Sequence, residues 1–262
     1  KGGLAYGNIV DSASSLKNIV KHCNKFNPKI DLVIVTGDLT DSGQIEEYDA
    51  FNKIIELLDM PWFLIPGNHD DCQNIFKFFS KHEYLPKNED FCNYVIDKFP
   101  FNLIGIDTTV SGQNFGELCN KRLRWLDLNL NQYAKKPTFL FMHHHPFVSG
   151  IDGMDSQNMR NPEKLFDILK SHPHVKHIAC GHVHRAVETV VDGIGVSIAP
   201  NGAHSVNLDL DSKGPPMFIM EPPSIRIFKL NDTNKSVVSH LSFVGNFDGP
   251  YPFYSDSGDL LT

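Results

Sequence analysis

The chain has 262 residues, and its composition and charge exclude several classes of protein. Hydrophobic residues make up 41% of the chain and Phe alone occurs 19 times, which excludes a disordered protein. No apolar run approaches the ~18–20 residues that span a bilayer, so we expect no membrane protein. The 24 Lys and Arg against 31 Asp and Glu give a net charge of −7, which disfavours a protein that coats nucleic acid. The unusual number is the 13 His.

The five cysteines are spaced irregularly, and no two of them form a C-x-x-C pair. An odd number without that spacing disfavours both a disulfide framework and a cysteine-type zinc site. The first residues also lack the apolar segment of a secretory signal. We therefore expect reduced, mostly buried thiols in a cytoplasmic protein.

Up to residue 180, apolar runs typical of strands alternate with helical periodicity, which is the pattern of an α/β fold. Asp11 can cap the first helix, whose apolar side chains share one face. In chain order the pattern predicts a helix over 12–23, a strand over 32–36, a helix over 48–58, strands over 62–65, 94–96 and 103–106, a helix over 121–133, a strand over 138–142, a helix over 162–170 and a strand over 177–180.

Beyond residue 186 the pattern changes to short β-type runs separated by Gly and Pro, at 186–191, 196–199, 225–230 and 237–244. We expect these strands to complete a single catalytic domain over 1–244. Residues 205–223 would form a cap or loop insert, richest in Gly, Pro and Met after Asp211. Residues 245–262, rich in Gly, Pro and aromatic side chains, would form a C-terminal arm. Together with 217–223, this arm offers a surface for a homo-oligomer.

Polar residues with metal-binding side chains follow four of the predicted strands: Asp38, Asn68-His69, His143-His144-His145 and His182-x-His184. Ligands bind at the carboxyl ends of strands in open α/β sheets, so these side chains should meet at one rim. Asp, Asn and His without Cys suit Zn, Fe or Mn. Taken alone, Asp38 could sit in an ordinary turn and Asn68-His69 could precede a capped helix. The joint occurrence at strand ends favours a metal site.

Four segments together resemble the calcineurin-like metallophosphoesterases: Gly37-Asp38-Leu39-Thr40-Asp41, Gly67-Asn68-His69-Asp70, Met142-His143-His144-His145-Pro146 and Gly181-His182-Val183-His184-Arg185. Within that superfamily the chain is similar to the bacterial class III cyclic nucleotide phosphodiesterases and their glycerophosphodiesterase relatives. Weaker points of likeness are Leu4-Ala5-Tyr6-Gly7 and Gly245…Gly249-Pro250. The resemblance implies a four-layer α/β/β/α sandwich of two mixed β-sheets flanked by helices.

The resemblance also implies a centre of two divalent ions, Fe, Mn or Zn. Asp38 would bridge both ions, Asn68, His143 and His182 would bind one of them, and His184 would bind the other. Asn68 and His69 are the expected catalytic residues. His69 would lie beside the phosphate, where it stabilises charge or protonates the leaving oxygen.

Other polar residues near these motifs receive weaker assignments. His144 is expected in the second shell, orienting a ligand, although a solvent-facing role for His144 or His145 stays open. His204 would join His69 in contacting the substrate. Asp70 and Asp71 should cap the helix that follows them rather than bind metal. Five further histidines are expected at the surface: His22, His82, His172, His174 and His240.

The chain departs from the family pattern in one respect. That pattern begins with Asp-x-His at the end of a first strand, and no Asp-x-His precedes Asp38 here. We expect the motif to lie on an N-terminal segment upstream of Lys1. Without it, the ion shared by Asp38 and His184 would bind weakly or not at all.

The resemblance implies hydrolysis of a small phosphodiester, with 3′,5′-cyclic nucleotides as the first choice, by attack of a hydroxide held by the ions. A glycerophosphodiester or a broad range of diesters is the alternative, and the expected pocket walls at 150–160 and 201–204 would decide. A different class of function is a non-catalytic scaffold of the same fold, like the retromer subunit, which has lost ligands. The five ligand positions that remain argue against a scaffold, and a mononuclear storage or sensor protein would not need His69.

Overall fold

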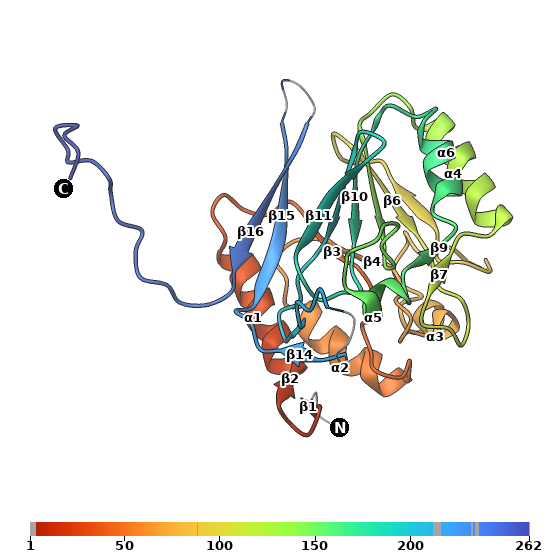
Figure 1. Cartoon of the computed structure of the whole chain (residues 1–262), viewed down its shortest axis with the longest axis horizontal. Coiled ribbons are helices and arrows are strands. Elements are labelled where there is room, and N and C mark those ends of the chain that lie inside the picture. The colour runs from red at the N-terminus through yellow and green to blue at the C-terminus, as the bar shows by residue number, and fades with distance from the viewer. Residues whose placement is uncertain (1–3, 88, 212–215, 232, 234–235, 262) are drawn as a thin grey trace.

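The computed structural model describes residues 4–87, 89–211, 216–231, 233 and 236–261, and its elements stack in four layers (Figure 1). The first layer is formed by α1 (Ser12–Lys25), α2 (Ile45–Ile55) and α3 (Cys72–Phe78). Two strand pairs make up the second layer, a larger sheet the third, and α4 (Asn120–Gln132) with α6 (Glu163–Leu169) the fourth. The expected α/β/β/α sandwich is therefore confirmed.

The third layer is a six-stranded mixed sheet with the strand order β11-β12-β10-β8-β6-β5. Its strands are β11 (Val187–Val191), β12 (Ile194–Ile198), β10 (Val175–Cys180), β8 (Thr138–Met142), β6 (Asn102–Ile106) and β5 (Tyr94–Ile96). The four central strands are parallel, and β11 and β5 pair antiparallel at the edges. Every residue of β6 and β8 is buried because other layers cover both faces of the sheet.

The second layer consists of a parallel pair, β3 (Val33–Val35) and β4 (Trp62–Leu64), and an antiparallel hairpin, β15 (Ser224–Leu230) and β16 (Val237–Phe243). Both pairs pack on the same face of the six-stranded sheet. Phe228 of β15 contacts Phe139 of β8 at a ring distance of 4.8 Å, and Phe63 of β4 belongs to the same apolar cluster.

Two apolar cores hold the layers together. The first fills the space between α1–α3, β3–β4 and the inner face of the six-stranded sheet. The second lies between the outer face of that sheet and the apolar stripes of α4 and α6. As predicted, the Asp11 carboxylate caps α1 by accepting a hydrogen bond from the Ser14 backbone N–H at 2.9 Å.

The predicted strands and helices are all present, with ends shifted by a few residues. The periodicity did not reveal the short elements: the ladders β1–β2 (Leu4–Ala5, Val10–Asp11), β7–β9 (Gly116–Glu117, Met159–Arg160) and β13–β14 (Ser205–Val206, Phe218–Ile219), and the helix α5 (Asp152–Asp155). Ladders of two residues and a helix of one turn are too short to show a period.

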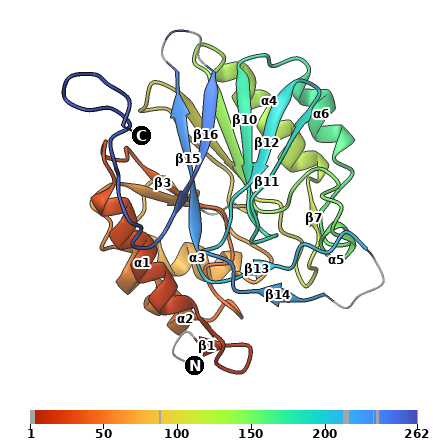
Figure 2. The same ribbon diagram turned by 60° about the vertical axis from the view of Figure 1, so that its left-hand side comes forward.

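Residues 245–261 extend away from the body of the molecule, and the views in Figures 1 and 2 agree on this. Their aromatic side chains, Phe247, Tyr251, Phe253 and Tyr254, are exposed. All five cysteines are free, and three of them are buried. Among the described residues, no helix has the length and apolar character needed to cross a bilayer.

Two leucines of α4 test the second core. Leu126 is fully buried, whereas 68% of Leu128 is exposed on the same helix. We expect Leu126→Ala to lower the free energy of unfolding by about 3 kcal/mol, because the cavity adds to the lost transfer energy. Leu128→Ala, the matched control, should change it by less than about 0.5 kcal/mol. Urea unfolding measures both free energies, and equal losses in the two variants would contradict the burial of Leu126 in the second core.

Candidate metal centre

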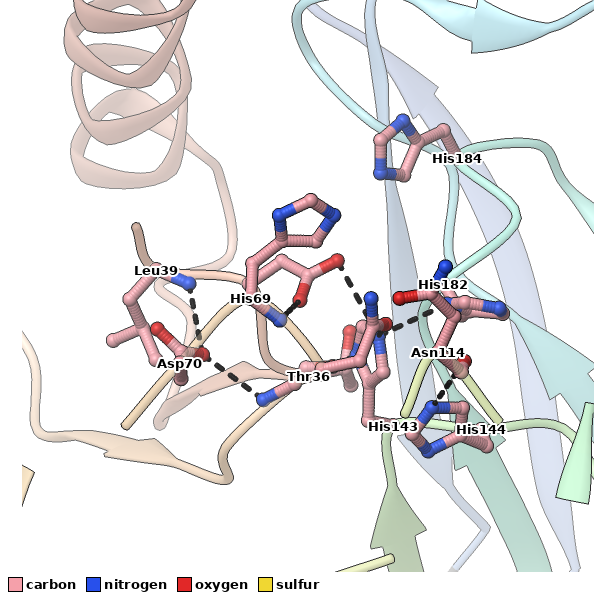
Figure 3. Close-up of polar contacts among 12 residues, drawn as sticks. Thr36, Leu39, His69, Asp70, Asn114, His143, His144, His182 and His184 are labelled. Carbon is pink, nitrogen blue, oxygen red and sulfur yellow. Dashed lines mark hydrogen bonds and ion pairs between the residues drawn. The ribbon is translucent and has the colours of Figure 1, made fainter. Parts of the chain in front are cut away.

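Four loops bring the predicted polar side chains to one rim of the two sheets (Figure 3). Asp38 follows β3, Asn68 follows β4, His143 follows β8 and His182 follows β10. Parallel neighbouring strands end on the same side, so these four side chains meet. His144, in the same loop as His143, packs against His182 at a ring distance of 4.8 Å.

The backbone of these loops is held in an uncommon conformation. The φ angles of Asp38, His182 and His184 are +54°, +72° and +57°, in the left-handed region that side chains other than glycine rarely adopt. Each such residue costs about 1–3 kcal/mol and persists only where the surroundings impose it. Three of them at one rim, all at predicted ligand positions, indicate a functional constraint.

Two glycines allow the loops to approach closely. A Cβ on Gly37 would lie 2.5 Å from Nδ1 of His143, which is closer than real Cβ atoms come. A Cβ on Gly67 would collide with the Asp38 carboxylate. The sequences Gly37-Asp38 and Gly67-Asn68 therefore keep glycine for close packing around the centre.

Four atoms that carry lone pairs converge at the rim. Nδ1 of His143 donates to the Thr36 carbonyl at 2.7 Å, so Nε2 presents its lone pair to the centre. That Nε2 lies 3.0 Å from Asn68 Oδ1, 3.2 Å from His182 Nδ1 and 3.3 Å from Asp38 Oδ2. Ligand atoms around a divalent ion lie about 3.0–3.6 Å from one another. The donor set and its spacing fit a divalent cation.

The protonation states of the residues at the centre also fit a bound divalent cation. Burial lowers the pKa of His182 to about 2 and of His184 to about 4, which keeps both rings neutral. Burial opposes ionisation of Asp38, but the adjacent His143 holds the pKa of that carboxyl below its ordinary value. Burial likewise opposes protonation of His143, and Asp38 raises its pKa above the ordinary value. A cation would therefore take the place of one proton on His143.

His144 lies in the same cluster, yet both of its ring nitrogens are occupied. Its Nε2 donates to the Asn114 carbonyl at 3.1 Å, and its Nδ1 bonds the Thr108 hydroxyl at 2.8 Å. Nδ1 must accept that bond, because burial keeps the pKa of His144 well below its ordinary value and the ring neutral. His143, His144 and His182 form the His group that could hold a metal, but only His143 and His182 offer free lone pairs.

The remaining predicted residues lie around this cluster. His69 is exposed; its backbone N–H donates to Asp38 Oδ1 at 3.1 Å and its ring Nδ1 donates to the Asp41 carbonyl at 3.0 Å. His184 is set apart from the four converging atoms, and its Nδ1 lies 3.0 Å from His204 Nε2 (Figure 3).

The geometry invites comparison with known proteins. The sequence model of the calcineurin-like phosphoesterases matches residues 8–186. The chain belongs to the calcineurin-like phosphoesterase family. A protein of Arcobacter nitrofigilis named as a probable glycerophosphodiester phosphodiesterase, GpdQ, is 41% identical over 262 residues, covering 100% of this chain and 95% of that protein.

Two further relatives extend the comparison. A probable cyclic nucleotide phosphodiesterase of Rhodopseudomonas palustris is 30% identical, covering 98% of this chain and 92% of that protein. Among solved structures, a dimetal phosphatase from Danio rerio has a TM-score of 0.63 at 14% identity, covering 90% of this chain and 93% of that chain. That likeness supports the fold of this calcineurin-like phosphoesterase.

The structure gives Asp70 a different place from the one predicted. Asp71, not Asp70, caps α3, by accepting from the Asn74 N–H at 2.8 Å. The Asp70 carboxylate accepts from the backbone N–H of Leu39 at 3.1 Å and of Gly67 at 2.9 Å. It therefore ties the loop that carries Asp38 to the loop that carries Asn68.

Two hydroxyl groups complete the surroundings of Asp70. Thr40 Oγ1 donates to its Oδ1 at 3.0 Å, and the Tyr48 hydroxyl of α2 lies 3.3 Å from the same oxygen. Burial, and then the nearby Asp38, raise the pKa of Asp70 to about 6, so the group is still mostly ionised at neutral pH. No sequence signal distinguished Asp70 from a helix cap.

The expectation for the other histidines was wrong in one case. His172 is buried, and its Nε2 lies 2.8 Å from Oδ1 of Asp127 in α4. Because Asp127 is 45 residues away in the sequence, no local pattern indicated this contact. His22, His82 and His174 are half-buried, and His240 is exposed.

The role of Asp70 in holding the two ligand loops together can be tested by measuring metal affinity. In Asp70→Asn the negative charge is lost and an NH2 group replaces one of the two acceptor oxygens, so the hydrogen bonds that join the two loops should weaken. We expect divalent metal affinity to fall about 10–100-fold, as for other partners that orient ligands. Chelator competition with Mn²⁺ or Zn²⁺ measures it.

The matched control is the neighbouring Asp71→Asn. Asn also caps helices well, so this variant should bind metal like the wild type. Equal metal affinity of both variants would contradict the role given to Asp70.

Proposed function

We propose that this chain hydrolyses phosphodiesters with divalent metal ions, using Asp38, Asn68, His143, His182 and His184 as ligands. The observation that carries the proposal is the convergence of three lone-pair atoms around Nε2 of His143, at 3.0–3.3 Å from it. These atoms carry few protons between them, so their lone pairs repel one another. A bound cation would remove that repulsion. Membership of the calcineurin-like phosphoesterases supports the same activity.

The ions, when bound, supply an activated water and polarise the phosphoryl group. The residues around them bind and orient the substrate. His69 is exposed and its Nδ1 donates to the Asp41 carbonyl, so donation from Nε2 to a phosphoryl or leaving oxygen would require the imidazolium form of the ring. The Asp38 carboxylate fixes the backbone of His69 at 3.1 Å, so the imidazole is positioned by the same residue that we propose as the bridging ligand.

His184 and His204 form the second part of the proposed site. Their ring nitrogens are 3.0 Å apart, so His204 can orient His184 or contact the substrate next to it. The other face of His204 meets Tyr6 and Phe218 at ring distances of 5.3 and 5.6 Å. A second ion bound at His184 and Asp38 is part of the proposal.

For the substrate we propose a glycerophosphodiester first, supported by the 41% identity to the protein named for that activity. A 3′,5′-cyclic nucleotide is the second candidate. It is favoured by the rings of Tyr6 and Phe218, stacked 4.8 Å apart beside His204, because aromatic rings pack well against a nucleobase.

We further propose that residues 1–244 form the catalytic domain, with 205–223 as its insert and 245–262 as an arm. Residues 1–3, 88, 212–215, 232, 234–235 and 262 of these segments lie outside the described residues. The exposed aromatic side chains of the arm support a homo-oligomer. A cytoplasmic location stays a prediction.

Side-by-side hydrolysis of glycerophosphocholine and 3′,5′-cyclic AMP tests the proposed activity, with Mn²⁺, Fe²⁺ or Zn²⁺ added. We expect metal-dependent release of the alcohol from at least one diester, with the higher kcat/KM for glycerophosphocholine. Metal-free protein should be inactive. If neither diester is hydrolysed with any of these metals and no ion binds, the result would instead support a non-catalytic scaffold.

The ligand assignment has its own test. We expect Asp38→Ala and Asn68→Ala each to lower kcat at least about 10³-fold, because each removes a donor to the ions, while the fold is retained. Asp31→Ala, at an exposed position just before β3, is the control and should keep wild-type turnover. Circular dichroism checks the fold, and near-normal rates in either site variant would refute the assignment.

A further inference from the structure

The loop after β8 contains two histidines that the converging donor atoms do not use. His144 and His145 follow His143 directly and are both fully buried. A buried imidazole needs hydrogen-bond partners. Both nitrogens of His144 find a partner on one loop at the rim of the site, whereas His145 finds one on another loop through Nε2, and its Nδ1 has no partner among the described residues.

His144 holds the loop of residues 108–116, which follows β6. At the beginning of that loop, the Thr108 hydroxyl bonds Nδ1 of His144 at 2.8 Å and accepts the backbone N–H of His144 at 3.3 Å. Near its end, the Asn114 carbonyl accepts from Nε2 at 3.1 Å. Gly116 packs so closely on the ring that a Cβ there would lie 2.5 Å from Nδ1.

His145 holds the loop of residues 147–158, which follows β8. Its Nε2 bonds Asp155 Oδ1 at 3.4 Å. The Asp155 carboxylate in turn accepts the backbone N–H of Ser149 at 2.7 Å and of Gly150 at 2.8 Å. The other end of the loop returns to the same residue, because the Met159 N–H donates to the His145 carbonyl at 3.1 Å.

The two loops form one continuous wall. The β7–β9 ladder joins them, and the Gly116 N–H donates to the Asn158 carbonyl at 3.2 Å. The second loop reaches the insert over 205–223: a Cβ on Gly150 would lie 3.5 Å from Leu210. β7, α5 and the insert strands β13 and β14 lie at the same end of the molecule (Figure 2).

We propose that His144 and His145 are positioning residues that set which phosphodiester the site accepts, by fixing the wall built from residues 108–116 and 147–158. The inference rests on the proposed function. Both loops leave the carboxyl ends of the adjacent strands β6 and β8, and His143 follows β8, so this wall borders any diester held at His143. The two alcohol groups of the diester must fit against it.

The test removes one anchor at a distance from the ligands. Asp155→Ala frees the second loop, and His145→Leu breaks the same contact from the other side. We expect each variant to change the ratio of kcat/KM for 3′,5′-cyclic AMP over glycerophosphocholine by about tenfold or more, as changes of a pocket wall do. Mn²⁺ affinity, measured by chelator competition, should stay within about threefold of wild type.

Three further variants sharpen the result. His145→Gln keeps a donor at the position of Nε2 and should restore the wild-type ratio. The double variant of His145→Leu with Asp155→Ala should show no more change than Asp155→Ala alone, because Asp155→Ala already removes the contact with His145 together with the bonds to Ser149 and Gly150. Glu163→Ala, an exposed acid at the start of α6 and outside the wall, is the control and should leave the ratio unchanged.

The outcomes separate this inference from the proposed function. If the wild type hydrolyses a diester but the variants lower both rates equally, the wall does not set specificity. If the variants lose metal affinity, the two histidines belong to the metal centre. If the wild type hydrolyses neither diester, the proposed function fails and this inference fails with it. Should His145→Leu not fold, Asp155→Ala and His145→Gln decide.

Discussion

The arrangement around His143 depends on one constraint: lone pairs that face each other repel unless a positive charge lies between them. The Thr36 carbonyl accepts the Nδ1–H of His143, so Nε2 faces the oxygens of Asp38 and Asn68 and a nitrogen of His182, and either a proton on Nε2 or a bound cation must lie between them. The backbone allows these four atoms to come close together. Asp38 and His182 adopt left-handed φ angles, and Gly37 and Gly67 have no side chain that would collide there.

The residues around the centre divide into those that face it and those that hold the loops. Asp70 receives donors from both ligand loops of the second layer, and His144 and His145 each fix one loop of the third layer. A fold that stores strain in ligand loops needs such holders, because an unsupported loop would relax to an ordinary conformation. Buried polar groups near the centre are therefore as informative as the ligands.

The sequence predicted the strands and their ends well, because apolar runs and their polar endings are local signals, whereas the four layers followed from the family resemblance. Asp38, Asn68, His143 and His182 could be placed at one rim for that reason. The place of Asp70 could not be predicted, since its partners Leu39 and Tyr48 are 31 and 22 residues away. Nor could the burial of His172, which depends on Asp127 in another helix. Local patterns do not encode which distant segment covers a side chain.

The division of the ligands between two layers has a mechanical consequence. Asp38 and Asn68 follow strands that share no ladder with the six-stranded sheet, whereas His143 and His182 follow strands of that sheet. An ion bound by all four would act as a cross-link between two layers that also meet through side-chain packing and through hydrogen bonds such as those from His143 to Thr36 and from Arg226 to Ile198. Binding of such an ion would raise the free energy of unfolding by an amount that grows with the logarithm of its concentration over its dissociation constant. An ion at this centre would therefore serve stability as well as catalysis, because the contact between the two halves of the sandwich would strengthen as the metal concentration rises.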